Sequence, residues 1–102
     1  AQVDQDGWIG REAALTFPAT TRHTKAIVEV VRFPARTDLP LTVDVNGAAR
    51  TVNLALETTE RIEVPLSADR ATTLKLAADR VYELSKGDPR ERSVRIVNID
   101  FQ

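Results

Sequence analysis

The chain has 102 residues, and its 14 Lys+Arg against 15 Asp+Glu leave a formal net charge of −1. This balance gives no charge-driven attraction to nucleic acid or anionic lipid. The absence of cysteine excludes a disulfide framework, a thiolate zinc site and a cysteine nucleophile.

No apolar run approaches the ~20 residues that a membrane span needs. The opening "AQVDQDG" lacks the basic start and apolar stretch of a signal peptide. We therefore expect one domain over residues 1–102, either a whole protein or a piece of a longer one. We expect neither a nucleic-acid partner nor insertion into a membrane.

Strand-like alternation begins early in the chain. "EAALTF" (12–17) places Ala13, Leu15 and Phe17 on one face, as expected for a strand with one buried side. "KAIVEVVRF" (25–33) is apolar on both faces in its middle, which predicts a central strand covered on both sides.

The clearest hairpin follows. "LTVDV" (41–45) and "RTVNLAL" (50–56) both alternate, and Asn46-Gly47 between them supplies residues that tolerate positive φ. A second alternating pair, "RIEVPL" (61–66) and "TTLKLAA" (72–78), is joined by "SADRAT". Pro65 cannot donate a ladder hydrogen bond, so the first strand of this pair is predicted to lie at an edge or to carry a bulge.

The last part of the chain is more mixed. "DRVYELSKGDPRERS" (79–93) is the least strand-like segment, whereas "VRIVNIDF" (94–101) predicts a closing strand with Val97, Ile99 and Phe101 on one face. Short strands about ten residues apart predict an all-β fold, an antiparallel, jelly-roll-like β-sandwich.

Catalytic residues are scarce. His23 is the single histidine and lies in the polar segment "ATTRHTK", where a solvated loop residue is the simpler interpretation. There is no glycine-rich phosphate loop, so we expect no cofactor. Paired carboxylates are too common in the sequence to indicate glycosidase chemistry by themselves. We predict that the chain is not an enzyme.

Acidic residues near the two chain ends raise the question of a metal. Asp4, Asp6 and Asp100 carry oxygen ligands of the kind that calcium prefers. They lie near the two chain ends, and the terminal strands of a sandwich are often neighbours. Their spacing matches no calcium loop, and solvated turn residues are the simpler interpretation. We predict no metal site.

Two aromatic residues have both a flat face and a polar group. Trp8 and Tyr82 lie in or beside loops, where a ring can stack on the apolar face of a sugar. Trp8 can equally cap one open end of the core. The three phenylalanines occupy strand positions and are predicted to be core residues.

An arginine-rich block precedes the last strand. Asp88, Arg90 and Arg92 can bond sugar hydroxyls or acidic groups, because arginine binds anions in bidentate geometry. The alternative is structural, with Arg90 or Arg92 tying this loop to an N-terminal carboxylate such as Asp6.

Taken in order, these segments carry a resemblance. "DGWIG" leads into "EAALTF", then come the hairpin "LPLTVDVNGAARTVNL", the strand "IEVPL" and the block "GDPRERSVRIVNIDF". This order resembles the small β-sandwich modules attached to bacterial glycosyltransferases and related surface-polysaccharide enzymes, which are similar to carbohydrate-binding jelly rolls.

The resemblance spans Asp6 to Phe101. In the family pattern the last block reads Asp-Asp-Arg-Arg-Leu-Gly. Asp88 matches an acidic position, and Arg90 and Arg92 match the basic ones. Pro89 and Glu91 interrupt the run, and Ser93-Val94 replaces Leu-Gly.

The resemblance implies a non-catalytic accessory module that holds an oligosaccharide or polysaccharide near a parent or partner catalytic domain. The candidate contacts are Trp8, Tyr82, Asp88, Arg90 and Arg92. The alternative is a structural or protein-interaction sandwich with no small-molecule ligand.

Overall fold

The computed structural model describes residues 7–35, 38–83 and 91–102, and these residues form only strands, turns and loops. The strands are β1 (Glu12–Phe17), β2 (Lys25–Arg32), β3 (Leu39–Val45), β4 (Ala48–Leu54), β5 (Glu60–Pro65), β6 (Thr72–Ala78), β7 (Tyr82–Glu83), β8 (Glu91–Arg92) and β9 (Val94–Phe101). The predicted strand segments are thus all confirmed, with small shifts at their ends.

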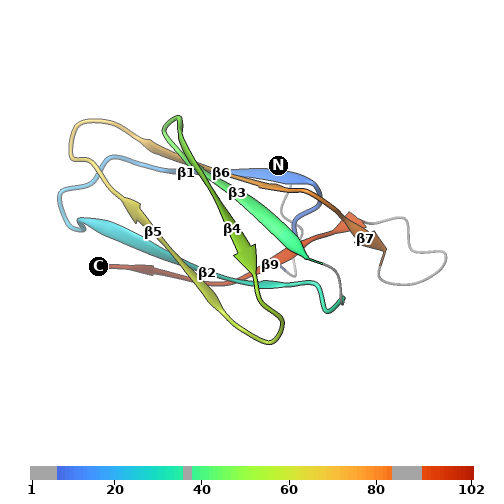
Figure 1. Ribbon diagram of the computed structural model, residues 1–102. Helices are drawn as coiled ribbons and strands as arrows, with labels where there is room; N and C mark the ends of the chain where they lie inside the picture. Colours follow the sequence, from blue (N-terminus) through green and yellow to red (C-terminus); the bar gives the residue numbers. More distant parts are fainter. Residues whose placement is uncertain (1–6, 36–37, 84–90) are drawn as a thin grey trace.

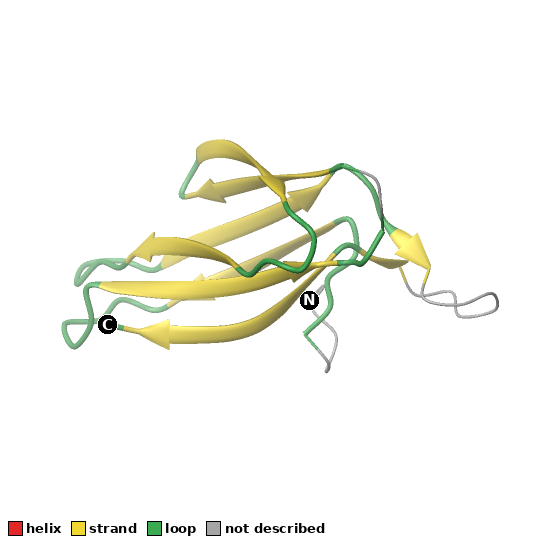
Figure 2. Cartoon of the chain, turned by 60° about the horizontal axis from the view of Figure 1, so that its bottom comes forward, coloured by secondary structure: helices red, strands yellow, loops and turns green. Residues whose placement is uncertain are grey.

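Two antiparallel sheets make up the body of the molecule. One has the order β1-β6-β3-β4 and the other the order β5-β2-β9, while β7 and β8 form a small separate ladder. The two main sheets lie face to face (Figure 1), and the described residues contain strands and loops without a helix (Figure 2). This arrangement confirms the predicted all-β antiparallel sandwich.

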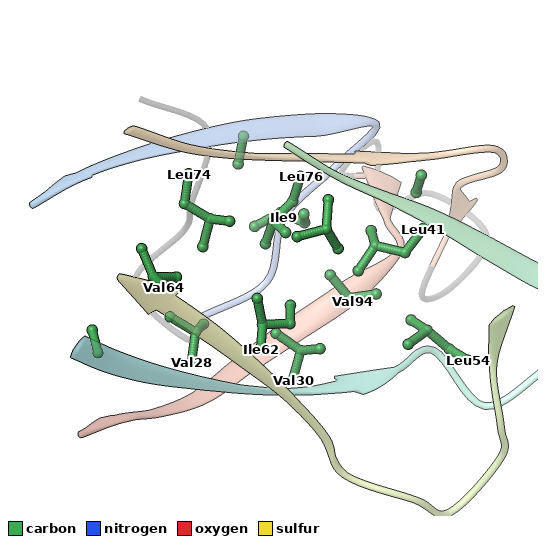
Figure 3. Packing of buried hydrophobic residues seen from close by; sticks show 14 of the residues in the cluster. Ile9, Val28, Val30, Leu41, Leu54, Ile62, Val64, Leu74, Leu76 and Val94 are labelled. Atoms are coloured by element: carbon green, nitrogen blue, oxygen red, sulfur yellow. The ribbon is translucent and has the colours of Figure 1, made fainter. Parts of the chain in front are cut away.

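The core fills the space between the sheets. Alternate residues of each strand point inward, because successive side chains of a strand lie on opposite faces. Figure 3 shows the inward side chains of both layers meeting, together with Ile9 from the N-terminal segment. Fully buried members include Ile9, Val28, Val30, Leu41, Ile62, Val64, Leu74 and Val94.

The hairpin between β3 and β4 forms as predicted. Asn46 has φ 50° and Gly47 has φ 93°, the left-handed values of a two-residue turn that matches strand twist. The side chain of Asp44 closes the turn, since its Oδ1 accepts a hydrogen bond of 2.7 Å from the Gly47 N–H.

The second alternating pair is not a hairpin. β5 belongs to the three-stranded sheet and β6 to the four-stranded sheet, so the intervening segment crosses between the layers. β5 is an edge strand, and Pro65 stands at its last position opposite Lys25. The prediction of an edge for Pro65 is confirmed, because only an edge tolerates the missing N–H there.

β2 is the central strand of its sheet, as predicted. Its inward residues Ala26, Val28 and Val30 belong to the core, and Ile27 on the opposite face is only 2% exposed. Ile27 lies between Glu63 of β5 and Asp100 of β9 in the register. In the described part of the chain, neighbouring side chains of the same sheet, rather than a further layer, surround it.

β9 departs from the prediction in one respect. Its register with β2 shifts between Glu29 and Val30, so that Ile99 pairs with Val28 and Ile96 with Val30. Val97 is therefore the extra residue of a β-bulge, and the expected common face of Val97, Ile99 and Phe101 is interrupted. All three side chains are exposed.

Candidate functional site: an aromatic cluster at one end of the sandwich

The segment around Trp8 is fastened to the start of β9. Ile9 N–H donates to the Val94 carbonyl at 2.9 Å, and Ile96 N–H donates to the Gly7 carbonyl at 2.8 Å. Between these bonds Trp8 forms an antiparallel bridge with Arg95. The backbone of Trp8 is thus held at a defined position beside the last strand.

Gly7 makes this attachment possible. Its φ is +90°, a conformation that residues with a side chain rarely adopt, and a Cβ there would overlap the carbonyl oxygen of Ile96. Any other residue at position 7 would push the segment away from β9. The glycine of the "DG" before the tryptophan is therefore required by the close approach of this segment to β9.

Three aromatic rings gather next to this attachment. Trp8 and Phe33 have ring centroids 6.0 Å apart at an interplanar angle of 58°. Phe33 and Tyr82 are stacked, with centroids 4.8 Å apart and planes only 8° apart. The two rings singled out in the sequence are thus joined through Phe33, and both are half-buried.

Arg92 completes this cluster from β8. Its Cζ lies 6.0 Å from the centroid of the Trp8 ring, within the range of a cation–π interaction, and β8 places it opposite Tyr82. Arg92 is only 2% exposed, so its place is inside the cluster rather than on the surface. The other predicted contacts, Asp88 and Arg90, lie outside the described residues.

Arg32 shapes the loop that follows β2. Its guanidinium donates to three carbonyls: Nε to Phe33 at 3.1 Å, Nη1 to Leu54 at 3.2 Å and Nη2 to Ala35 at 2.9 Å. This side chain is buried, and its bonds connect the loop to the end of β4. The planar fork of arginine suits such multiple acceptors, which a lysine could not satisfy together.

An open depression of ≈ 410 Å³ lies between these elements. Trp8, Val31, Pro34 and Leu56 give it apolar walls, and Glu57 and Arg95 add charged groups of both signs. Arg95 is exposed, as are Leu56 and Glu57. An aromatic wall beside hydrogen-bonding groups is suited to a ring that has an apolar face and polar edges.

Three residues of this site were not identified from the sequence. Phe33 was predicted to be core, but it is half-buried and links Trp8 to Tyr82. Glu57 reaches the depression from a turn in which its own φ is 58°. Arg95 follows the arginine-rich block inside the predicted closing strand, but it was not among the candidate contacts.

The other two phenylalanines differ in burial. Phe17 is buried as predicted, whereas Phe101 is 46% exposed and contacts Phe17 edge-on at 6.0 Å. His23 lies 5.6 Å from the Phe101 ring, and the two line a shallow hollow of ≈ 210 Å³. This hollow lies at the far end of β9 from Trp8.

The acidic side chains of the described residues do not form a metal site. In the part of the chain that the structure describes, no three His, Cys, Asp or Glu side chains gather in a way that would hold an ion. Asp4 and Asp6 lie outside that part, and Asp100 accepts a hydrogen bond from Gln102 Nε2 at 3.1 Å. Residues 7–35, 38–83 and 91–102 also contain no helix suited to crossing a membrane.

Comparison with known proteins places the chain among β-sandwiches. A carbohydrate esterase of family two from Clostridium thermocellum, solved in complex with cellohexaose, is similar over 97% of this chain, with a TM-score of 0.50 and 21% sequence identity. At this identity the likeness shows the fold alone, and the chain spans 28% of that protein's length. No protein-family model matches the chain, and no curated protein matches it.

Proposed function

We propose that this protein is a non-catalytic carbohydrate-binding module, and that a sugar ring occupies the depression beside Trp8. The observation that carries the proposal is the half-buried Trp8 ring lining a ≈ 410 Å³ depression that also holds Glu57 and Arg95. In this arrangement Trp8 covers the apolar face of the ring, while Glu57 accepts and Arg95 donates hydrogen bonds to hydroxyl groups.

Two further observations support the proposal. The residue order resembles that of sandwich modules attached to polysaccharide enzymes and glycosyltransferases, which favours a catalytic domain as the partner. Among the strands of the two main sheets, β4, β5, β6 and β9 follow one another along the chain and alternate between the sheets, which fits jelly-roll-like connectivity. The C. thermocellum esterase of similar fold was solved with cellohexaose, which makes a cello-oligosaccharide the first probe to use.

The proposal is tested by titrating ¹⁵N-labelled protein with cellohexaose and then with a panel of neutral and acidic oligosaccharides. We expect saturable shifts at the Trp8 indole N–H and at the amides of residues 31–35, 56–57 and 95. Because the depression is shallow and open, we expect a weak complex. No shift with any sugar of the panel, or shifts confined to the far end of β9, would refute the site.

Two conservative variants test whether the polar groups of the depression, rather than the neighbouring cluster, contact the sugar. Glu57→Gln keeps the size of the side chain and removes one charged acceptor, so it should weaken binding without changing stability. Tyr82→Phe removes a hydroxyl from the cluster but lies outside the residues that line the depression. Equal binding by wild type and Tyr82→Phe, with weaker binding by Glu57→Gln, is the expected pattern.

A further inference from the structure

The turn between β3 and β4 carries a chemically reactive pair, Asn46-Gly47. The backbone nitrogen of the residue that follows an asparagine can attack the side-chain amide, and a glycine hinders this attack least because it has no side chain. The other asparagines of the chain, Asn53 and Asn98, precede a leucine and an isoleucine. Both residues of the turn are exposed, and a Cβ on Gly47 would meet nothing within 4 Å.

Hydrogen bonds occupy both reacting groups of this pair. Asn46 N–H donates to the Thr73 carbonyl at 3.0 Å, and Asn46 Oδ1 accepts from the Thr73 N–H at 2.9 Å. Gly47 N–H donates to Asp44 Oδ1 at 2.7 Å. The amide that would be attacked is thus bound to β6, and the nitrogen that would attack is bound to Asp44.

The backbone of the turn also keeps the reacting atoms apart. The φ values of Asn46 and Gly47, 50° and 93°, are those of a mirror-image type I′ turn. Such a turn sets ψ of its first central residue at about 30°, which directs the Gly47 nitrogen away from the Asn46 side chain. Ring closure needs this nitrogen on the side of the Asn46 Cβ. The required rotation breaks the turn and its hydrogen bonds.

We infer that Asn46 is a deamidation site that the native fold protects, and that it reacts when the β3–β4 turn detaches from β6. In the open turn the Gly47 nitrogen gives up its proton and bonds to Asn46 Cγ, while the side-chain NH₂ takes up a proton and leaves as ammonia. The product is a five-membered succinimide. Water opens this ring at either carbonyl, which gives aspartate or isoaspartate without any oxidation or reduction.

Isoaspartate cannot restore the native turn. The main chain then runs through the former side chain and is one methylene longer, and a free carboxylate is added close to Asp44. A two-residue turn fixes the register of the strands that it joins, so the longer link no longer fits between β3 and β4. Each reaction that ends in isoaspartate therefore records an opening of this turn.

The experiment compares the rate of deamidation in the folded and the unfolded chain. The intact chain is incubated at mildly alkaline pH, in native buffer or in guanidinium chloride, and the peptide that contains Asn46 is followed by mass spectrometry. We expect the folded chain to react at least about tenfold more slowly, which corresponds to an opening free energy of about 1.4 kcal/mol or more. The peptides with Asn53 and Asn98 are internal controls that should stay unmodified.

Two variants of Asp44 test the protection by hydrogen bonding. Asp44→Ala removes the acceptor of the Gly47 N–H, whereas Asp44→Asn keeps a carbonyl oxygen there. We expect Asn46 to react several-fold faster in folded Asp44→Ala than in wild type, with a smaller change in Asp44→Asn. Circular dichroism establishes that both variants are folded.

Three results would overturn the inference. Equal rates in the folded and the unfolded wild type would show that the fold gives no protection. A slower reaction in folded Asp44→Ala than in wild type would show that the carboxylate assists the attack instead of preventing it. An Asn46 that stays unmodified in the unfolded chain would remove the site itself.

Discussion

Replacing Gly7 by alanine tests how Trp8 is held in place, and Gly47 provides a matched control. Both glycines have φ near +90°, but a Cβ on Gly7 overlaps the Ile96 carbonyl while a Cβ on Gly47 meets nothing within 4 Å. The left-handed conformation costs an alanine about 1–2 kcal/mol at either position. The overlap at Gly7 adds about 1–3 kcal/mol of overpacking.

We therefore expect Gly47→Ala to lower the free energy of unfolding by about 1–2 kcal/mol, and Gly7→Ala by about 2–5 kcal/mol. The assay is urea unfolding at equilibrium, in which a changed midpoint with an unchanged m-value reports stability. Because alanine restricts the unfolded chain equally at both sites, that contribution cancels in the comparison.

The tryptophan emission gives a second, local readout. If the overlap is relieved by detachment of the Gly7–Ile9 segment, Trp8 leaves Phe33 and Arg92 and its emission shifts to longer wavelength. Gly47→Ala should leave the emission unchanged. Equal stabilities and equal emission spectra for the two variants would refute the argument that close approach to Ile96 requires glycine at position 7.

The remaining predictions concern the core and the cluster. Leu41→Ala should lower the free energy of unfolding by about 2–5 kcal/mol in urea titrations, and Leu56→Ala, on the surface, by less than about 0.5 kcal/mol; similar losses would contradict the described burial. Arg32→Lys should cost about 1–3 kcal/mol, because buried carbonyls lose their donors, and calorimetry showing an unchanged Tm would contradict this. Phe33→Leu should abolish the near-ultraviolet dichroism that arises from coupling between Trp8 and the neighbouring rings, and an unchanged spectrum would argue against the stacked cluster.

Local sequence patterns predicted the strands well and their partners less well. The alternation in residues 12–17 and 72–78 reports which side chains are buried, because only one face of an edge or surface strand meets the core. It does not report which sheet a strand joins. β5 and β6 follow one another with similar alternation, yet they lie in opposite layers.

The candidate site also depends on contacts between distant segments, which local sequence patterns do not report. Trp8 and Tyr82 were identified by residue type alone, since rare aromatic residues beside loops attract attention. Their connection through Phe33 depends on where the loop after β2 turns. Arg32 holds that turn by donating to carbonyls of the loop itself and to the carbonyl of Leu54, which is distant in the sequence. The bulge at Val97 is likewise a property of pairing, and no residue in the sequence marks it.

The strand order has a consequence for how the chain folds. Within the two main sheets, β6 from the second half of the chain lies between β1 and β3, and β2 from the first half lies between β5 and β9. In each main sheet, a strand from one half of the chain therefore lies between two strands from the other half. A chain cut between β4 and β5 should give two fragments that stay unfolded separately and regain structure only when mixed, so that neither half accumulates as a folding intermediate.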